Sequence, residues 1–302
     1  MHFRIVSPSA CVDIENVQLA QTHLQNLGHQ VSLAPHVFSQ YRYLAGTVEQ
    51  RLEDLKQACL DPSVDAIWCA RGGTGAGMLL PFLAEWMLNK PILGYSDTTA
   101  LLNYVAMHGG QAIHAPVFQE IAVKNLQDQP LSSDALKCLD LLATHQLSTQ
   151  QTIQSKTQPK AQQYALNEAN AFTQIQDQSD LHILGGNLTV LCSLQGTAES
   201  LKLSQASALL IEDVGEPYYR IERALTQLLQ SIDTSLLKAF VLGDFYQCPQ
   251  KNVPHSMIEI VAEHLEPLNI PLYQCEWFGH GAMNRPFWIG KKGKIVDSQL
   301  FI

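Results

Sequence analysis

Ser96 lies in the stretch ILGYSDTTALLNYV, between an apolar run that ends at Gly94 and an apolar helical pattern that begins near Thr98. Its position allows two interpretations. A serine before a helix commonly caps it, because its hydroxyl accepts a hydrogen bond from a free N–H of the first turn, and Asp97 could serve equally well. Alternatively, Ser96 is a nucleophile, which needs a base within hydrogen-bond reach and an acid that orients the base.

Candidate partners for Ser96 follow other apolar runs farther along the chain. Glu212 and Asp213 follow the run SALLI, and His280 lies between two glycines in FGHGAMN. Acidic residues at a strand end are most often solvated charges, whereas flanking glycines allow close approach to the backbone. The order serine, acid, histidine is that of α/β-hydrolases, but GYSDT lacks the last glycine of the GxSxG motif.

Arg71, Gly72 and Gly73 form another polar turn, directly after the run VDAIWCA. The backbone N–H groups of this turn could bind an anion, or the turn could simply be tight. The stretch GGTGAG is not followed by Lys-Ser or Lys-Thr and lacks the GxGxxG order, so it does not predict nucleotide binding. Weaker candidates for a cleft wall or a packed strand end are His114, Glu216 and Asp244.

The elements that position these turns alternate between strand and helix in the first half. The strand patterns are FRIVS, QVSLA, VDAIWCA and PILGYS, and the helical patterns include residues 15–27, which stop at Gly28, and TVEQRLEDLKQACL, with Thr47 and Gln50 as a capping pair. This alternation predicts a parallel α/β sheet, in which ligands bind beyond the carboxyl ends of the strands.

We therefore expect an α/β fold with an N-terminal parallel-sheet domain and flanking helices, followed by a smaller C-terminal α/β domain. Residues 1–147 are assigned to the first domain and 180–302 to the second. Residues 148–179 are rich in Gln, Thr, Ser and Asn, which predicts a linker or an exposed excursion, with a decorated hairpin as the alternative. The end of the chain, GKIVDSQLFI, predicts a pair of strands.

Composition excludes several classes of function. The chain has 302 residues, 46% of them hydrophobic and 16% charged, with a net charge of −9 that argues against nucleic acid as a partner. No apolar stretch is long enough to span a membrane and no signal peptide begins the chain, so a cytoplasmic protein is expected. Seven scattered cysteines without CxxC, and the absence of HExxH, predict reduced thiols and neither a metal nor a cofactor.

Seven stretches in this order resemble the LD-carboxypeptidase family of serine peptidases, from about Pro8 to about Gly290. They are YLAGTVEQRLEDL, DAIWCARGGTGAGMLLPFL, ILGYSDTTALL, LGGNLTVLCSLQGT, LLIEDVGEPYYRIERALTQL, LGDF and FGHGAMN. The chain resembles, more distantly, the microcin C immunity peptidases of the same superfamily. The resemblance implies a Ser96–Glu212–His280 triad, a homodimer, and a muropeptide substrate, murein tetrapeptide, whose terminal D-alanine is removed. Glu212 is preferred to Glu216 because it directly follows a strand that can aim it rigidly.

A serine peptidase also needs donors for the oxyanion that forms during attack. The backbone N–H groups of Asp97, Gly72 and Gly73 are the candidates. Arg71 could bind the free carboxylate of the substrate in a bidentate manner, or it could brace its own turn.

Two other functions stay open on the sequence. An immunity-type serine peptidase would cleave a peptide–nucleotide amide and would need an aromatic platform for the base, for which Trp277 and Trp288 are candidates. A binding module on a relic hydrolase scaffold would bind a ligand without turnover.

Overall fold

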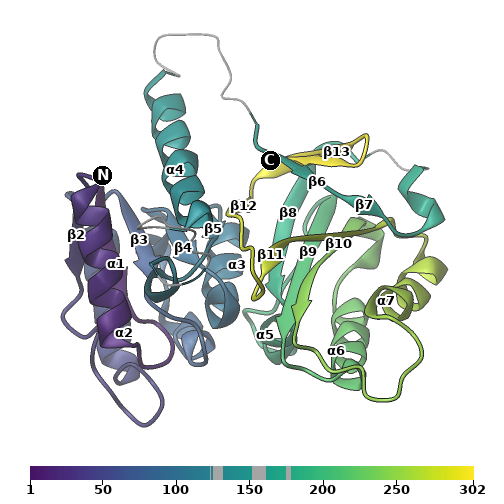
Figure 1. The fold of residues 1–302 in the computed structure, drawn as a ribbon, viewed down its shortest axis with the longest axis horizontal. Helices are drawn as coiled ribbons and strands as arrows, with labels where there is room; N and C mark the ends of the chain where they lie inside the picture. Colours follow the sequence, from purple (N-terminus) through teal and green to yellow (C-terminus); the bar gives the residue numbers. More distant parts are fainter. Residues whose placement is uncertain (123, 125–131, 152–160, 175–177) are drawn as a thin grey trace.

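Two β-sheets with helices packed around them make up the fold of the computed structural model (Figure 1). The sheet of the amino-terminal half and the sheet of the carboxyl-terminal half lie side by side in Figure 1. The predicted α/β class is confirmed, while the domain limits stay a prediction. The structure describes residues 1–122, 124, 132–151, 161–174 and 178–302.

The first sheet has the strand order β12-β5-β4-β3-β1-β2. Its neighbours pair in parallel except β12, which pairs antiparallel with β5. The parallel arrangement brings the carboxyl ends of β3, β4 and β5 to one edge, so the turns that follow them meet there. The strands are β1 (His2–Val6), β2 (Gln30–Leu33), β3 (Ala66–Cys69), β4 (Ile92–Gly94), β5 (Ala112–His114) and β12 (Phe287–Ile289).

The first two helices of this half begin and end close to where local sequence predicts. Thr47 Oγ1 accepts a hydrogen bond from the N–H of Gln50, and the Gln50 side chain accepts one from the N–H of Thr47, which confirms the capping box. Gly28 follows the first helix with φ 84°. The helices are α1 (Ile14–Asn26), α2 (Val48–Leu60), α3 (Thr99–Met107) and α4 (Ser133–Gln151), with 3₁₀ turns η1 (Ala76–Met78), η2 (Leu80–Phe82), η3 (Glu85–Leu88), η4 (Ser96–Thr98) and η5 (Phe118–Glu120).

The second sheet has the order β6-β14-β13-β8-β9-β10-β11-β7 and is parallel from β8 to β11. The predicted terminal strand pair is confirmed as β13 and β14, and two strands of the predicted excursion, β6 and β7, lie at the two edges. The strands are β6 (Gln163–Ala165), β7 (Asn167–Glu168), β8 (Leu181–Asn187), β9 (Ser207–Val214), β10 (Leu237–Tyr246), β11 (Leu272–Gly279), β13 (Lys292–Val296) and β14 (Gln299–Phe301).

The helices that accompany the second sheet in the described residues are α5 (Leu188–Ser193), α6 (Tyr218–Ser231) and α7 (Met257–Leu265). The 3₁₀ turns of this half are η6 (Ala171–Gln174), η7 (Thr234–Leu236) and η8 (Glu266–Leu268). No helix within the described ranges has both the length and the apolar character that a bilayer crossing requires.

Helix α3 fixes the two halves against each other. The Asn103 side chain donates to the carbonyl of Gly185 on β8 (2.7 Å) and accepts from its N–H (3.2 Å), so the amide is paired in both directions. One turn earlier, Thr99 Oγ1 accepts from the N–H of Asn187 (3.0 Å). All of these groups are buried, where a hydrogen bond lost on one side leaves an unsatisfied partner. The start of α3 is therefore held at the carboxyl end of β8.

All seven cysteines carry free thiols, and five of them are buried. The expectation that most of them are core residues is confirmed. Burial raises the pKa of Cys59 to about 12, so this thiol stays protonated and unreactive.

Candidate active site

Ser96 occupies a strained turn between β4 and α3. Its φ is 61°, in the left-handed region, where a residue with a side chain costs about 1–2 kcal/mol. Neither η4 nor α3 has a side-chain cap, so the capping interpretation of Ser96 is wrong. Asp97 does not cap α3 either, because its Oδ2 accepts a hydrogen bond from the N–H of Ala76 (2.8 Å). The strain at Ser96 thus lacks a local structural explanation and indicates a functional position.

The Gly72 turn after β3 is pressed against Ser96. A methyl group on Gly72 would lie 2.7 Å from Ser96 Cβ, 2.8 Å from its Oγ and 3.3 Å from the Asp97 nitrogen. Gly73 has φ 102°, and a methyl group there would lie 2.7 Å from Ala10 Cβ. Within the described residues, the N–H groups of Gly72 and Gly73 donate to no oxygen. Two free amide donors therefore lie in a turn that adjoins the serine.

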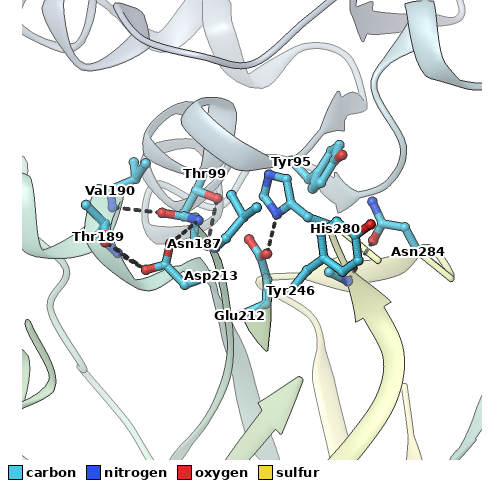
Figure 2. Close-up of polar contacts among 12 residues, drawn as sticks. Tyr95, Thr99, Asn187, Thr189, Val190, Glu212, Asp213, Tyr246, His280 and Asn284 are labelled. Carbon is cyan, nitrogen blue, oxygen red and sulfur yellow. Dashed lines mark hydrogen bonds and ion pairs between the residues drawn. The ribbon is translucent and has the colours of Figure 1, made fainter. Parts of the chain in front are cut away.

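Glu212 and His280 form a direct pair at the carboxyl ends of β9 and β11 (Figure 2). His280 Nδ1 lies 2.6 Å from Glu212 Oε2, and Glu212 is 0% exposed. The interpretation of Glu212 as a solvated charge is therefore wrong. A buried carboxylate at this distance holds the imidazole as the tautomer that carries its proton on Nδ1, which leaves Nε2 free to accept a proton.

Two opposing effects act on the pKa of His280. Burial lowers it, but the negative charge of Glu212 and the hydrogen bond to Nδ1 outweigh burial, so the pKa lies above its ordinary value of 6.5. The pair therefore favours the imidazolium form, which is the state that a general base reaches after it takes a proton.

Tyr95 brings the Ser96 turn to the histidine. The rings of Tyr95 and His280 lie 4.6 Å apart at an angle of 47°, and Figure 2 shows the imidazole between Tyr95 and Glu212. Among the described residues no hydrogen bond joins Ser96 to His280. Such bonds are often long without substrate and shorten when it binds. The structure thus pairs Glu212 with His280 directly and places the Ser96 turn against them through Tyr95.

Asp213 has a different role from its neighbour Glu212. Its carboxylate accepts hydrogen bonds from Asn187 Nδ2 (3.1 Å) and from the N–H (2.9 Å) and Oγ1 (2.7 Å) of Thr189 (Figure 2). Asn187 also caps α5 through the N–H of Val190. This network was not predicted, although an asparagine between a strand and a helix is a capping signal. The network fixes the end of β9. Because successive side chains of a strand point in opposite directions, Asp213 faces this network while Glu212 faces His280.

Both interpretations of Arg71 stay predictions. Its Nη1 donates to the carbonyl oxygen of Cys11. Arg71 is an exposed residue, and a grip of its side chain on a substrate carboxylate stays a prediction.

His114 is a packed strand-end histidine, as one interpretation held. It is 0% exposed, its Nε2 lies 2.9 Å from Asn284 Oδ1, and its ring stacks on Phe287 at 4.7 Å. Burial is the main cause that lowers the pKa of His114 to about 4.

This depressed pKa predicts a pH dependence of stability. The unfolded chain binds a proton to His114 below about pH 6.5, whereas the folded protein resists it down to about pH 4. The stabilisation by neutral His114 is therefore complete above pH 6.5 and falls by about 3 kcal/mol as the pH drops to 4. Urea unfolding from pH 7.5 to 4 should show a weaker pH dependence in His114→Gln than in the wild type. Equal slopes would contradict the assignment.

Other candidates from the sequence play minor parts. Trp277 and Trp288 are 5% and 7% exposed, so neither offers an open face for a nucleotide base. Glu216 forms a surface pair with Arg220 (3.3 Å). Within the described part of the chain, no group of three or more His, Cys, Asp or Glu side chains could hold a metal ion.

A serine at a strained turn after a parallel strand, with free amide donors and a carboxylate-paired histidine beside it, supplies the parts that a serine peptidase uses. Residues 3–115 match the family model of the LD-carboxypeptidase N-terminal domain, and residues 182–295 match that of the LD-carboxypeptidase C-terminal domain. The chain belongs to the LD-carboxypeptidase family and is an enzyme of the carboxypeptidase class.

Individual relatives agree with this placement. The chain is 37% identical to the murein tetrapeptide carboxypeptidase of Pseudomonas aeruginosa, over 98% of this chain and 93% of the relative. Among solved structures, the muramoyltetrapeptide carboxypeptidase from Oxalobacter formigenes has a TM-score of 0.80 at 23% identity, covering 100% of this chain and 97% of that one. The microcin C7 self immunity protein MccF has a TM-score of 0.77 at 20% identity, covering 100% and 95%. These two likenesses show the fold.

Proposed function

We propose that this carboxypeptidase removes the terminal D-alanine from murein tetrapeptide, with Ser96 as nucleophile, His280 as general base and Glu212 as the orienting acid. The observation that carries the catalytic assignment is the 2.6 Å bond between buried Glu212 and His280. The substrate is inferred from the murein tetrapeptide carboxypeptidase of Pseudomonas aeruginosa, whose name states it.

The proposed reaction follows from the chemistry of these groups. Ser96 Oγ attacks the carbonyl carbon of the diamino acid as His280 Nε2 takes the hydroxyl proton. The C–N bond then breaks, and His280 returns the proton to the departing amine of D-alanine, which leaves an acyl ester on Ser96. Water, deprotonated by the same imidazole, attacks the ester carbonyl, the C–O bond to Ser96 breaks as His280 returns the proton to Ser96 Oγ, and the tripeptide is released. Glu212 stabilises the imidazolium formed in each step.

The amide groups of Asp97, Gly72 and Gly73 would stabilise the oxyanion. The contact of the Gly72 turn with both Ser96 and Asp97 supports this assignment, because donors must already face the position where charge develops. Arg71 would bind the D-alanine carboxylate through the donors that it does not use on the Cys11 carbonyl.

Incubation of the purified protein with murein tetrapeptide tests the proposal. Mass spectrometry should show loss of one alanine and gain of one water, with free D-alanine detected by a stereospecific oxidase. The same peptide ending in L-alanine is the matched control and should remain intact. An unchanged D-alanine peptide, under conditions in which the Pseudomonas aeruginosa relative cleaves it, would contradict the proposal.

Gly72→Ala should lower kcat/KM by about 100-fold, because the added methyl would displace Ser96 Cβ from its position against the turn. Gly77→Ala is the matched control, since its methyl would meet only the end of the Leu194 side chain at 3.2 Å. Steady-state kinetics on both variants measures the difference. A Gly72→Ala enzyme as active as Gly77→Ala would remove this turn from the oxyanion site.

We also propose that the enzyme is a cytoplasmic homodimer. Free thiols throughout the described chain fit a reducing compartment, and the dimer is carried over from the family resemblance. Light scattering on the purified protein tests the dimer, and a monomeric mass would contradict it.

A further inference from the structure

Lys124 contacts both His280 and Tyr95, the residue before Ser96, and Glu120 contacts Tyr95. Lys124 Nζ donates to the backbone carbonyl of His280 (2.7 Å) and lies 5.7 Å from the centre of the Tyr95 ring. The Tyr95 hydroxyl donates to Glu120 Oε2 (2.6 Å). Lys124 Nζ lies 4.0 Å from Glu120 Oε2, so the two charges also face each other.

These contacts join segments that the chain keeps far apart. Tyr95 precedes Ser96 in the first half, whereas His280 comes from the second half after β11. The Tyr95 ring packs on the imidazole, and Lys124 holds the carbonyl of the same histidine. We propose that Lys124, Glu120 and Tyr95 are positioning residues that hold the His280 imidazole over the Ser96 turn. This inference rests on the proposed function, in which His280 is the base for Ser96.

The surroundings of Tyr95 and Lys124 support a positioning role. Tyr95 is 1% exposed, and burial is the first cause that raises the pKa of its phenol well above 10, so the hydroxyl stays protonated and donates to Glu120. The Lys124 side chain is 24% exposed, which keeps its charge partly hydrated while its ammonium reaches the His280 carbonyl. Tyr95 and Lys124 therefore each make their hydrogen bond, to Glu120 and to the His280 carbonyl, in the observed conformation.

The titratable groups around His280 come from β9, from β5, from η5 with the turn that follows it, and from β10. Glu212 is on β9, His114 ends β5, Glu120 ends η5, and Lys124 follows η5. Asp244 on β10 faces the glycines on both sides of His280. Among them, Lys124 lowers the pKa of His280 and Glu120 raises it, both less strongly than Glu212. Substitutions of Lys124 and Glu120 should therefore shift the titration of His280 in opposite directions.

The test is a set of three variants read by kinetics and by NMR titration of the His280 imidazole. Lys124→Met should lower kcat by about 10- to 100-fold with KM changed less than about 2-fold, since a small displacement of the base slows chemistry without weakening binding. It should also raise the pKa of His280, and the acid limb of kcat/KM should move to higher pH. Lys124→Arg, which keeps the donor and the charge, should restore both values. Glu120→Gln should lower the pKa of His280.

Lys90→Met is the matched control, because half-buried Lys90 also donates to a backbone carbonyl, that of Val64 (2.6 Å), away from this site. It should keep the kcat of the wild type. Lys124→Met with unchanged kcat and an unchanged His280 titration would overturn the inference even though the wild type cleaves tetrapeptide. A wild type that releases no D-alanine would instead contradict the proposed function, and the titrations would still test the contacts on His280.

Discussion

We expect Glu212→Gln to lower kcat by about 10⁴-fold, the loss typical when the carboxylate of such a triad becomes an amide. The glutamine NH₂ would donate to His280 Nδ1 at the position where the carboxylate now accepts at 2.6 Å. The imidazole proton would then reside on Nε2, so the ring could not take a proton from Ser96. KM should change little, because Glu212 is buried and does not contact bound peptide in the proposed reaction.

The same substitution should move the pH profile. With the charge of Glu212 gone, burial dominates and the pKa of His280 falls. A general base works when neutral, so in the wild type kcat/KM should rise with pH through a pKa above 6.5. In Glu212→Gln the remaining activity should also rise with pH, but through a lower pKa. Glu216→Gln is the matched control and should behave like the wild type. A larger loss in Glu216→Gln than in Glu212→Gln would reverse the assignment of the acid.

The parts of the fold that local sequence determines were predictable. The alternation of apolar runs with helical patterns gave the parallel sheet of the first half, and the Thr47–Gln50 pair marked the start of α2. These features depend on residues at most a few positions apart, where periodicity and capping chemistry operate. The carboxyl-end rule then directed attention to the turns of Gly72 and Ser96, which do contact each other.

Features that depend on contacts between distant segments were not predictable. Asn103 binds Gly185, and Lys124 binds the His280 carbonyl, across 82 and 156 residues of chain. No periodic pattern encodes such pairs, since each residue looks like an ordinary polar side chain in its own segment. The burial of Glu212 was also hidden, because a carboxylate becomes stable inside a protein only when a partner such as His280 arrives from elsewhere.

The conformation of Ser96 was hidden for a different reason. Local sequence favours a helix cap at a serine before a helix, and caps have extended backbone. The observed φ of 61° is unfavourable for serine, so only the surrounding structure can impose it. The hydrogen bonds of Asn103 and Thr99 to β8 hold the start of α3 in place, and this constrains the Ser96 turn that leads into the helix. A local preference was therefore overridden at the position proposed to carry the chemistry.

Ser96→Ala should lower kcat by about 10⁵- to 10⁶-fold, since a triad without its nucleophile retains only the contribution of the oxyanion site and binding. Ser96→Gly should be equally inactive but more stable than Ser96→Ala by about 1 kcal/mol. Alanine keeps the strain of φ 61°, whereas glycine adopts it freely, which more than offsets the greater entropy of glycine in the unfolded chain. Kinetics and urea unfolding of both variants measure the two effects.

Ser298 provides the matched control, because it is a serine with φ 54° in the turn between β13 and β14. Ser298→Ala and Ser298→Gly should show the same order of stability and keep full activity. The comparison separates the two properties that Ser96 combines, since strain occurs at both serines whereas the proposed chemistry belongs to one. Tetrapeptide cleavage by Ser96→Gly at the rate of the wild type would remove Ser96 as nucleophile, whatever the stability of that variant.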